Sequence, residues 1–217
     1  MSATESYPQY ALSERIADGV MHGLGIGLTL AGAISLLFWG IEGLEPGLSI
    51  ALGIYATTLV LSFVASGCYH MSPWPGAQPV LRRIDHAAIY ILIAGTMTPI
   101  AVMADTWLAY VQITLVWTMA VVGAARKVFW WSTPGRFGPM TYLAMGLSGA
   151  LLFGDLSSSV PAPAIKLMMM GGALYIVGVV FFSWEKLKFA IAIWHAFVLA
   201  ASACFFVAIV LSAATMV

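Results

Sequence analysis

The sequence predicts an all-α integral membrane protein built as a bundle of seven transmembrane helices. Three observations predict this fold class. The chain has 217 residues, of which 61% are hydrophobic and only 8% charged, whereas soluble domains carry roughly 25% charged residues. The apolar residues form seven stretches near the length of about 20 residues that a helix needs to cross a bilayer. Short connectors rich in Pro, Gly or charge separate these stretches.

The predicted spans follow from these interruptions. They are residues 17–40, 47–70, 84–103, 106–125, 137–154, 161–183 and 190–213. Asp105 and Thr106 form the shortest boundary, between the third and fourth spans. We therefore expect a short cytoplasmic N-terminal segment over residues 1–15 and one seven-helix membrane domain over residues 16–217.

Basic residues predict the orientation of the bundle, because positively charged loops remain cytoplasmic. Eight of the nine Lys and Arg residues fall on one side: Arg15, Arg82, Arg83, Arg126, Lys127, Arg136, Lys186 and Lys188. The other side has Lys166 together with Glu42, Glu45, Asp105 and Asp155. The N-terminus is therefore expected in the cytoplasm and the C-terminus outside it.

Charge and cysteine content argue against several classes of function. Nine basic residues balance nine acidic ones, so no basic excess indicates nucleic-acid binding. Cys68 and Cys204 lie in apolar segments, outside any CxxC pair, and are interpreted as small buried hydrophobic residues. A retinal protein would need a buried lysine, but Lys188 precedes the seventh span and Lys166 lies near the outer end of the sixth.

Four histidines, His22, His70, His86 and His195, all fall near the predicted cytoplasmic ends of their spans. Asp85 belongs to the same layer. Ser66 precedes His70 by four residues, which places a hydroxyl and an imidazole on one helix face. Imidazoles with a carboxylate suit zinc, and zinc can activate water for hydrolysis.

Simpler interpretations of these residues remain open. A single histidine near a membrane interface is often a hydrogen-bonded structural residue. Asp85 follows Arg82 and Arg83 closely enough for an interfacial ion pair. Glu14 and Asp18 repeat the four-residue spacing before His22, but they also suit the solvated, favourably charged start of a helix.

The motifs around these residues resemble a known family. They are "SGCYH" (66–70), "RRIDHAAIYILIAGTMTPI" (82–100) and "IWHAFVLAAS" (193–202), preceded by "ERIADGVMHGLGIGL" (14–28). Together they look like the hemolysin III family, the bacterial branch of the progestin and adiponectin receptor (PAQR) superfamily. The resemblance covers nearly the whole chain. It implies a seven-helix protein, which we expect in the bacterial inner (cytoplasmic) membrane.

The resemblance also implies a zinc site near the cytoplasmic side. The family's site has one histidine from the second helix and two from the seventh, with a Ser and an Asp around the water molecule bound to the zinc. By position, these residues fall on His70, His195, Ser66 and Asp85. The first histidine of the seventh-helix His-x-x-x-His motif should be at position 191, where this chain has Ile191.

Two other positions also differ from the family's pattern. Phe205 stands where the family often has a histidine, and Asp18 stands where its first helix has Asn. Asp85 could therefore become a direct ligand with His70 and His195. His22 or His86 could instead turn inward, or the site could be degraded and free of metal.

The leading functional hypothesis is a metal-dependent hydrolase of lipid amide or ester bonds. His70, His195 and Asp85 would be the zinc ligands, and Asp85 and Ser66 would be the catalytic residues. Membrane lipid is the expected partner, nucleic acid is not, and a homo-oligomer is left open. One alternative is a non-catalytic membrane-homeostasis or receptor-like protein with a degraded metal site. The other is a pore-forming cytolysin, although few ionisable residues are available at mid-membrane to line an ion path.

Overall fold

The computed structural model describes residues 10–39, 43–130, 137–184 and 186–216. All regular structure in these ranges is helical. The elements are α1 (Leu12–Trp39), α2 (Pro46–Met71), α3 (Gln78–Ala104), α4 (Trp107–Phe129), α5 (Phe137–Ser148), the 3₁₀ helix η1 (Gly149–Leu152), α6 (Phe153–Ser159), α7 (Ala162–Phe182) and α8 (Ala190–Ala213). Within this part of the chain, six helices are long and apolar enough to cross a membrane, namely α1, α2, α3, α4, α7 and α8.

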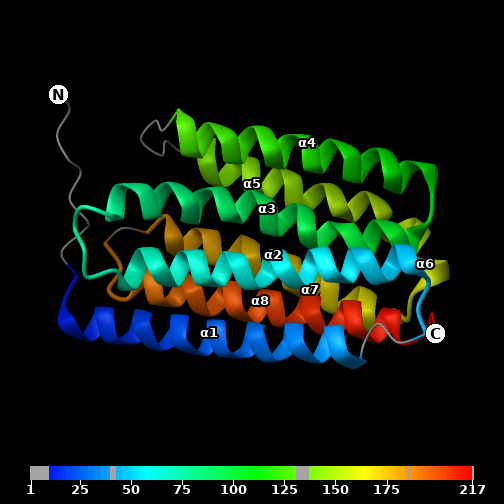
Figure 1. Ribbon diagram of the computed structural model, residues 1–217, viewed down its shortest axis with the longest axis horizontal. Coiled ribbons are helices and arrows are strands. Elements are labelled where there is room, and N and C mark those ends of the chain that lie inside the picture. Colours follow the sequence, from blue (N-terminus) through cyan, green and yellow to red (C-terminus); the bar gives the residue numbers. More distant parts are fainter. Residues whose placement is uncertain (1–9, 40–42, 131–136, 185, 217) are drawn as a thin grey trace.

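The long helices run side by side along the long axis of the molecule (Figure 1). α1 to α4 alternate in direction, as do α7 and α8, whereas α4 and α7 run the same way with α5, η1 and α6 between them. α3 lies at the centre: 67% of its most apolar window is buried, more than in any other candidate span of the described chain. It packs against α2 and α4 and also contacts α8. α1 packs against both α2 and α8, so the first and last helices of the bundle are neighbours.

The boundaries of α2, α7 and α8 lie within one residue of the predicted spans, whereas α1, α3 and α4 extend four to six residues beyond the predicted limit at one end. α8 begins at Ala190 and ends at Ala213, the limits that the apolar run predicts. At the shortest boundary, Asp105 adopts a left-handed conformation (φ 45°) and closes α3. Thr106 then caps α4, because its hydroxyl accepts a hydrogen bond from the Ala109 backbone N–H at 3.2 Å.

The predicted fifth span, 137–154, is the exception. Instead of one continuous helix, the chain forms α5, the single turn η1 and α6, which extends to Ser159. A Cβ atom at Gly149 would lie only 2.7 Å from Sδ of Met97 on α3. The glycine therefore permits a close approach to the central helix at the point where the α-helical geometry is interrupted.

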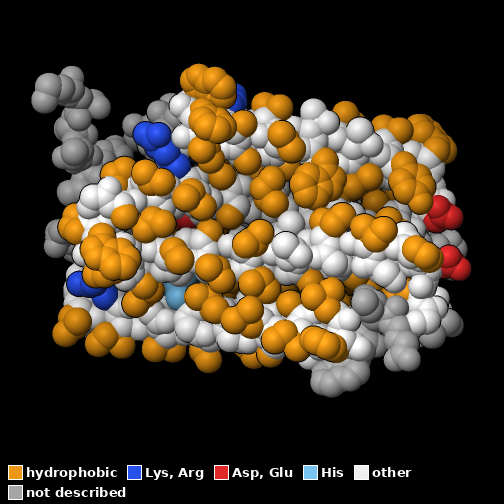
Figure 2. Space-filling model, in the orientation of Figure 1, with side chains coloured by type: hydrophobic (Ala, Val, Ile, Leu, Met, Phe, Trp, Pro, Cys, Tyr) orange, Lys and Arg blue, Asp and Glu red, His pale blue; other side chains and the backbone are white. Residues whose placement is uncertain are grey.

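Charge separates the two ends of the bundle, and Figure 2 shows Lys and Arg at one end and Asp and Glu at the other. The basic end contains Arg15, Arg82, Arg83, Arg126, Lys127, Lys186 and Lys188, together with Glu14. The acidic end contains Glu45, Asp105 and Asp155, together with Lys166. Arg136 and Glu42, which also entered the orientation argument, lie outside the described residues. Between the ends, large apolar side chains such as Leu28, Leu115 and Val180 are exposed. The chain is a multi-pass integral membrane protein.

Candidate metal centre

The first turns of α1 supply the polar face on which the site is built. Glu14, Asp18 and His22 are four residues apart, so they follow one another along the same side of the helix. Glu14 accepts hydrogen bonds from the backbone N–H groups of Ala11 at 3.1 Å and Phe189 at 3.0 Å. The second bond ties the start of α1 to the residue that precedes α8. This contact sets Asp18 and His22 against α8.

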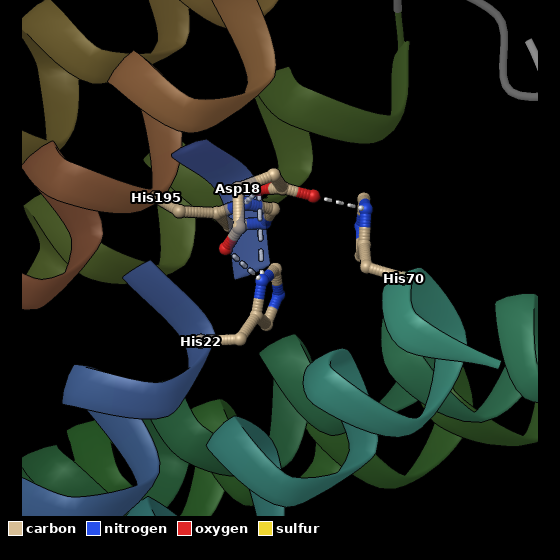
Figure 3. Close-up of side chains that lie close together, drawn as sticks. All are labelled: Asp18, His22, His70 and His195. Carbon is tan, nitrogen blue, oxygen red and sulfur yellow. Dashed lines mark hydrogen bonds and ion pairs between the residues drawn. The ribbon is translucent and has the colours of Figure 1, made fainter. Parts of the chain in front are cut away.

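Asp18 lies between histidines from two other helices (Figure 3). Its Oδ1 atom accepts a hydrogen bond from Nδ1 of His195 on α8 at 2.6 Å. Its Oδ2 atom lies 3.1 Å from Nδ1 of His70 on α2. Nδ1 of His22, one turn further along α1, is 3.6 Å from Oδ1. One carboxylate thus contacts three imidazoles.

The orientation of His22 is determined at both ring nitrogens. Its Nδ1–H donates to the Asp18 backbone carbonyl at 2.8 Å. Nε2 is then the unprotonated nitrogen of a neutral ring, and it accepts from the Ser66 hydroxyl at 3.2 Å. An Nδ1–H bond to a backbone carbonyl is the usual arrangement of a histidine that binds metal through its other nitrogen.

The three rings form a compact triangle. Their centroids are 4.3 Å apart for His22 and His195, 4.7 Å for His70 and His195, and 5.0 Å for His22 and His70. Asp18 and His22 are buried, with 6% and 4% of their surface exposed. A buried carboxylate inside a membrane segment is unfavourable without partners. The imidazoles supply these partners.

The donor set fits a transition metal. Each of Asp18, His22, His70 and His195 offers one ligand atom, and these atoms all lie within 4.8 Å of one another. In a tetrahedral zinc site, bonds of about 2.0–2.1 Å place neighbouring donors roughly 3.3 Å apart. The ligand atoms of the group lie within 4.8 Å of one another, so the side chains would have to shift for all four to reach that spacing around one ion. The same donors would also accept other first-row transition metals.

The structure places two of the residues chosen from the sequence within this group and two beside it. His70 and His195 contribute donor atoms. Ser66 contacts His22, and Asp85, which is 8% exposed on α3, contacts the Ser66 side chain. Among the described residues, the carboxylate of the donor group comes from Asp18.

The remaining histidine and the residue at position 191 have different surroundings. His86 lies outside the donor group, and its backbone carbonyl accepts a hydrogen bond from the Tyr142 hydroxyl at 3.1 Å. Ile191 lines a cavity of about 430 Å³ between α1, α2 and the start of α8, which Asp18 and His70 also line. The side chain at position 191 therefore lies on the wall of a cavity that reaches two of the metal-ligand candidates.

Comparison with known proteins agrees with this architecture. A family model described as "Haemolysin-III related" matches residues 10–206. The chain is 31% identical over 199 residues to the "Hemolysin-3 homolog" of Bacillus subtilis, covering 91% of this chain and 93% of that protein. It is 32% identical over 196 residues to "Hemolysin-3" of Bacillus cereus, covering 90% of each.

A more distant relative comes from animals. The human "Monocyte to macrophage differentiation factor" is 29% identical over 169 residues, which cover 74% of this chain and 69% of that protein. The residues that the family model matches include Asp18, His22, His70 and His195. This chain is a member of the haemolysin-III related family.

Proposed function

We propose that the protein is a metal-dependent hydrolase of lipid amide or ester bonds, with Asp18, His22, His70 and His195 as the residues that hold the metal. The observation that carries the proposal is the convergence of three imidazoles and one carboxylate from α1, α2 and α8. We take the metal to be zinc, which suits these donors and, when bound, would act as a Lewis acid that activates water at neutral pH.

Asp85 and Ser66 are suited to the proton transfers of hydrolysis. The Ser66 oxygen lies 3.2 Å from Nε2 of His22, and Ser66 also contacts Asp85, so Ser66 lies between the donor group and a second buried carboxylate. With metal on Nε2 of His22, the Ser66 hydroxyl would be available to Asp85 and to water. Asp85 would take a proton from the attacking water and return it to the leaving group, and Ser66 would orient that water. Such general acid–base assistance contributes typically 10²–10⁴-fold to a rate.

The same proposal includes a topology. α5, η1 and α6 would together make a fifth crossing, for a total of seven, because α4 ends at the basic end and α7 starts at the acidic end. The concentration of Lys and Arg supports a cytoplasmic location for the basic end. The N-terminus would then face the cytoplasm of a bacterial cell, the C-terminus would lie outside, and the metal centre would lie near the cytoplasmic face of the inner membrane.

Two observations favour a second, non-catalytic function. His195 and Asp18 already make a direct hydrogen bond of 2.6 Å, and Ile191 cannot ligate a metal. A group that is satisfied by its own hydrogen bonds would hold α1, α2 and α8 together without metal. A receptor-like or membrane-homeostasis protein could retain the group for that purpose.

Metal analysis and a turnover assay distinguish these functions. The protein purified in detergent without added metal should contain stoichiometric zinc, and His195→Ala should lack it. Asp85→Asn should retain zinc but lose hydrolysis of acyl amides and esters supplied in vesicles. Asp155→Asn, the same change at the opposite end of the bundle, is the matched control and should retain both properties.

Absence of zinc from the intact protein would contradict the metal centre. Zinc without turnover on any amide or ester would contradict the hydrolase and favour the non-catalytic function.

A further inference from the structure

We propose that the substrate is a single-chain acyl amide that carries a negative charge next to the scissile bond, as an N-acyl amino acid does. The inference rests on the proposed hydrolase function and names its substrate class. It comes from the cavity beside the metal centre and from Arg15 at its rim.

The cavity has the size and composition of a binding site for one acyl chain. Its volume of about 430 Å³ falls within the range of about 300–1,000 Å³ that is typical of small-molecule sites. Its walls include Ile16, Val20, Met71 and Ile191. Ile16, Val20 and Met71 are also more than half exposed on the outside of the bundle. An acyl chain could therefore enter the cavity from the surrounding bilayer.

Among the residues that the structure describes, three charged side chains line this cavity, and two of them are already engaged. Glu14 uses one carboxylate oxygen for the Ala11 N–H and the other for the Phe189 N–H. Asp18 is surrounded by imidazoles. Arg15 is exposed and, within the part of the chain that the structure describes, makes no hydrogen bond or ion pair. The charge available to a ligand is therefore a single guanidinium.

The position of Arg15 limits where the negative charge of the ligand can be. Arg15 precedes Asp18 by three residues, which corresponds to about 4.5 Å along the helix axis. A group held by Arg15 is thus within a few bonds of a carbonyl placed beside Asp18 and His70. In an N-acyl amino acid, one carbon separates the carboxylate from the amide nitrogen. A diacyl phospholipid instead has a glycerol unit between phosphate and ester, together with a second chain.

The reaction for this substrate class balances with water alone. The water oxygen bonds to the acyl carbon, the carbon–nitrogen bond breaks, and the nitrogen leaves as an amine that takes up a proton. The products are a fatty carboxylate and a free amino acid. No oxidant or reductant is needed.

The test compares two ligands that share the palmitoyl chain, N-palmitoylglycine and the neutral N-palmitoylethanolamine. Their binding to the full-length protein in detergent is measured by calorimetry, once as purified and once after chelator treatment to suppress turnover. A hydrogen bond to a charged group typically contributes about 1.5–3 kcal/mol, and exposure to solvent reduces such effects. We expect about tenfold tighter binding of the anionic ligand, which corresponds to the lower end of that range.

Two substitutions identify the group responsible. Arg15→Gln should abolish the preference for the anionic ligand. Arg126→Gln is the matched control, because Arg126 is exposed at the same end of the bundle but belongs to α4, which does not line the cavity. Equal binding of the two ligands by the unmodified protein, or equal effects of the two substitutions, would overturn the inference.

The hydrolase function and the substrate class can be contradicted separately. If N-palmitoylglycine binds more tightly in a way that depends on Arg15, but neither ligand is hydrolysed, the binding site is supported and the hydrolase function is contradicted. If both ligands bind with equal affinity and are hydrolysed at equal rates, the hydrolase function is supported and the anionic acyl amide is contradicted as the preferred substrate.

Discussion

Replacing Asp18 with Asn tests the identity of the carboxylate that belongs to the metal centre. The amide has the same shape as the carboxylate, and its Oδ1 atom can still accept the hydrogen bond from His195. What the substitution removes is the negative charge that faces His70 at 3.1 Å and His195 at 2.6 Å. The variant should therefore fold while losing a metal ligand.

The expected magnitudes differ for folding and for metal binding. A hydrogen bond to a charged group is worth about 1 kcal/mol more than a neutral one, which suggests about 2 kcal/mol for the two contacts. Polar contacts within membrane bundles average only about 0.6 kcal/mol, so we expect a stability loss near 1 kcal/mol in the metal-free protein. Even substitution of a residue that merely orients a ligand typically lowers metal affinity by about 10–100-fold. The loss at Asp18 should be at least that large.

Competition with a zinc chelator measures the affinity, and thermal unfolding of the metal-free protein measures the stability. Asp85→Asn is the comparison, because the sequence alone suggested Asp85 as the ligand. If Asp18→Asn binds zinc as tightly as the unmodified protein while Asp85→Asn does not, the carboxylate has been assigned to the wrong helix.

Two further substitutions test the cavity wall and the helix packing. Ile191→His should place an imidazole beside Asp18 and His70, which should restore zinc binding to the Asp18→Asn variant and weaken binding of N-palmitoylglycine in the narrower cavity. Chelator competition measures the zinc affinity, and calorimetry measures the binding of N-palmitoylglycine. A double variant that binds no more zinc than Asp18→Asn would contradict the placement. Gly95→Ala should lower the unfolding temperature in detergent, because the added Cβ would lie 2.8 Å from Thr58 Cβ and overlap the Thr58 hydroxyl. Such overpacking typically lowers the free energy of unfolding by about 1–3 kcal/mol. Gly172→Ala, with nothing within 4 Å of its added Cβ, should be neutral or stabilising by up to about 1 kcal/mol, and equal effects of the two glycine substitutions would refute the packing argument.

The long helices could be predicted from the sequence because bilayer thickness imposes a minimum apolar length on each span. The 190–213 run coincides with α8 for this reason. The interruption between α5 and α6 could not be predicted in the same way. It depends on how closely Gly149 approaches Met97 on another helix, and Gly is common in continuous membrane helices too.

The candidate site could also be predicted only in part from the sequence. The spacing and depth of His70 and His195 indicated that they belong to a common layer, and the structure brings them together. Asp18 was harder to assign, because a carboxylate in the first turns of a helix is usually solvated and favoured by the helix dipole. Its burial depends on the contact of α1 with α8, to which the hydrogen bond between Glu14 and Phe189 contributes. The four-residue spacing of Asp18 and His22, together with Ile191, was the available signal.

The contact between Asp18 and His195 joins residues 177 positions apart, near the two ends of the chain. During synthesis, α1 enters the membrane long before its partner helix has been made. Until α8 is inserted, the carboxylate of Asp18 faces lipid or an incomplete bundle that lacks the His195 ring. The contact can therefore form only after α8 has joined the bundle. A chain that stops before α8 would keep the Asp18 carboxylate in its first helix with His22 and His70 but without the hydrogen bond from His195.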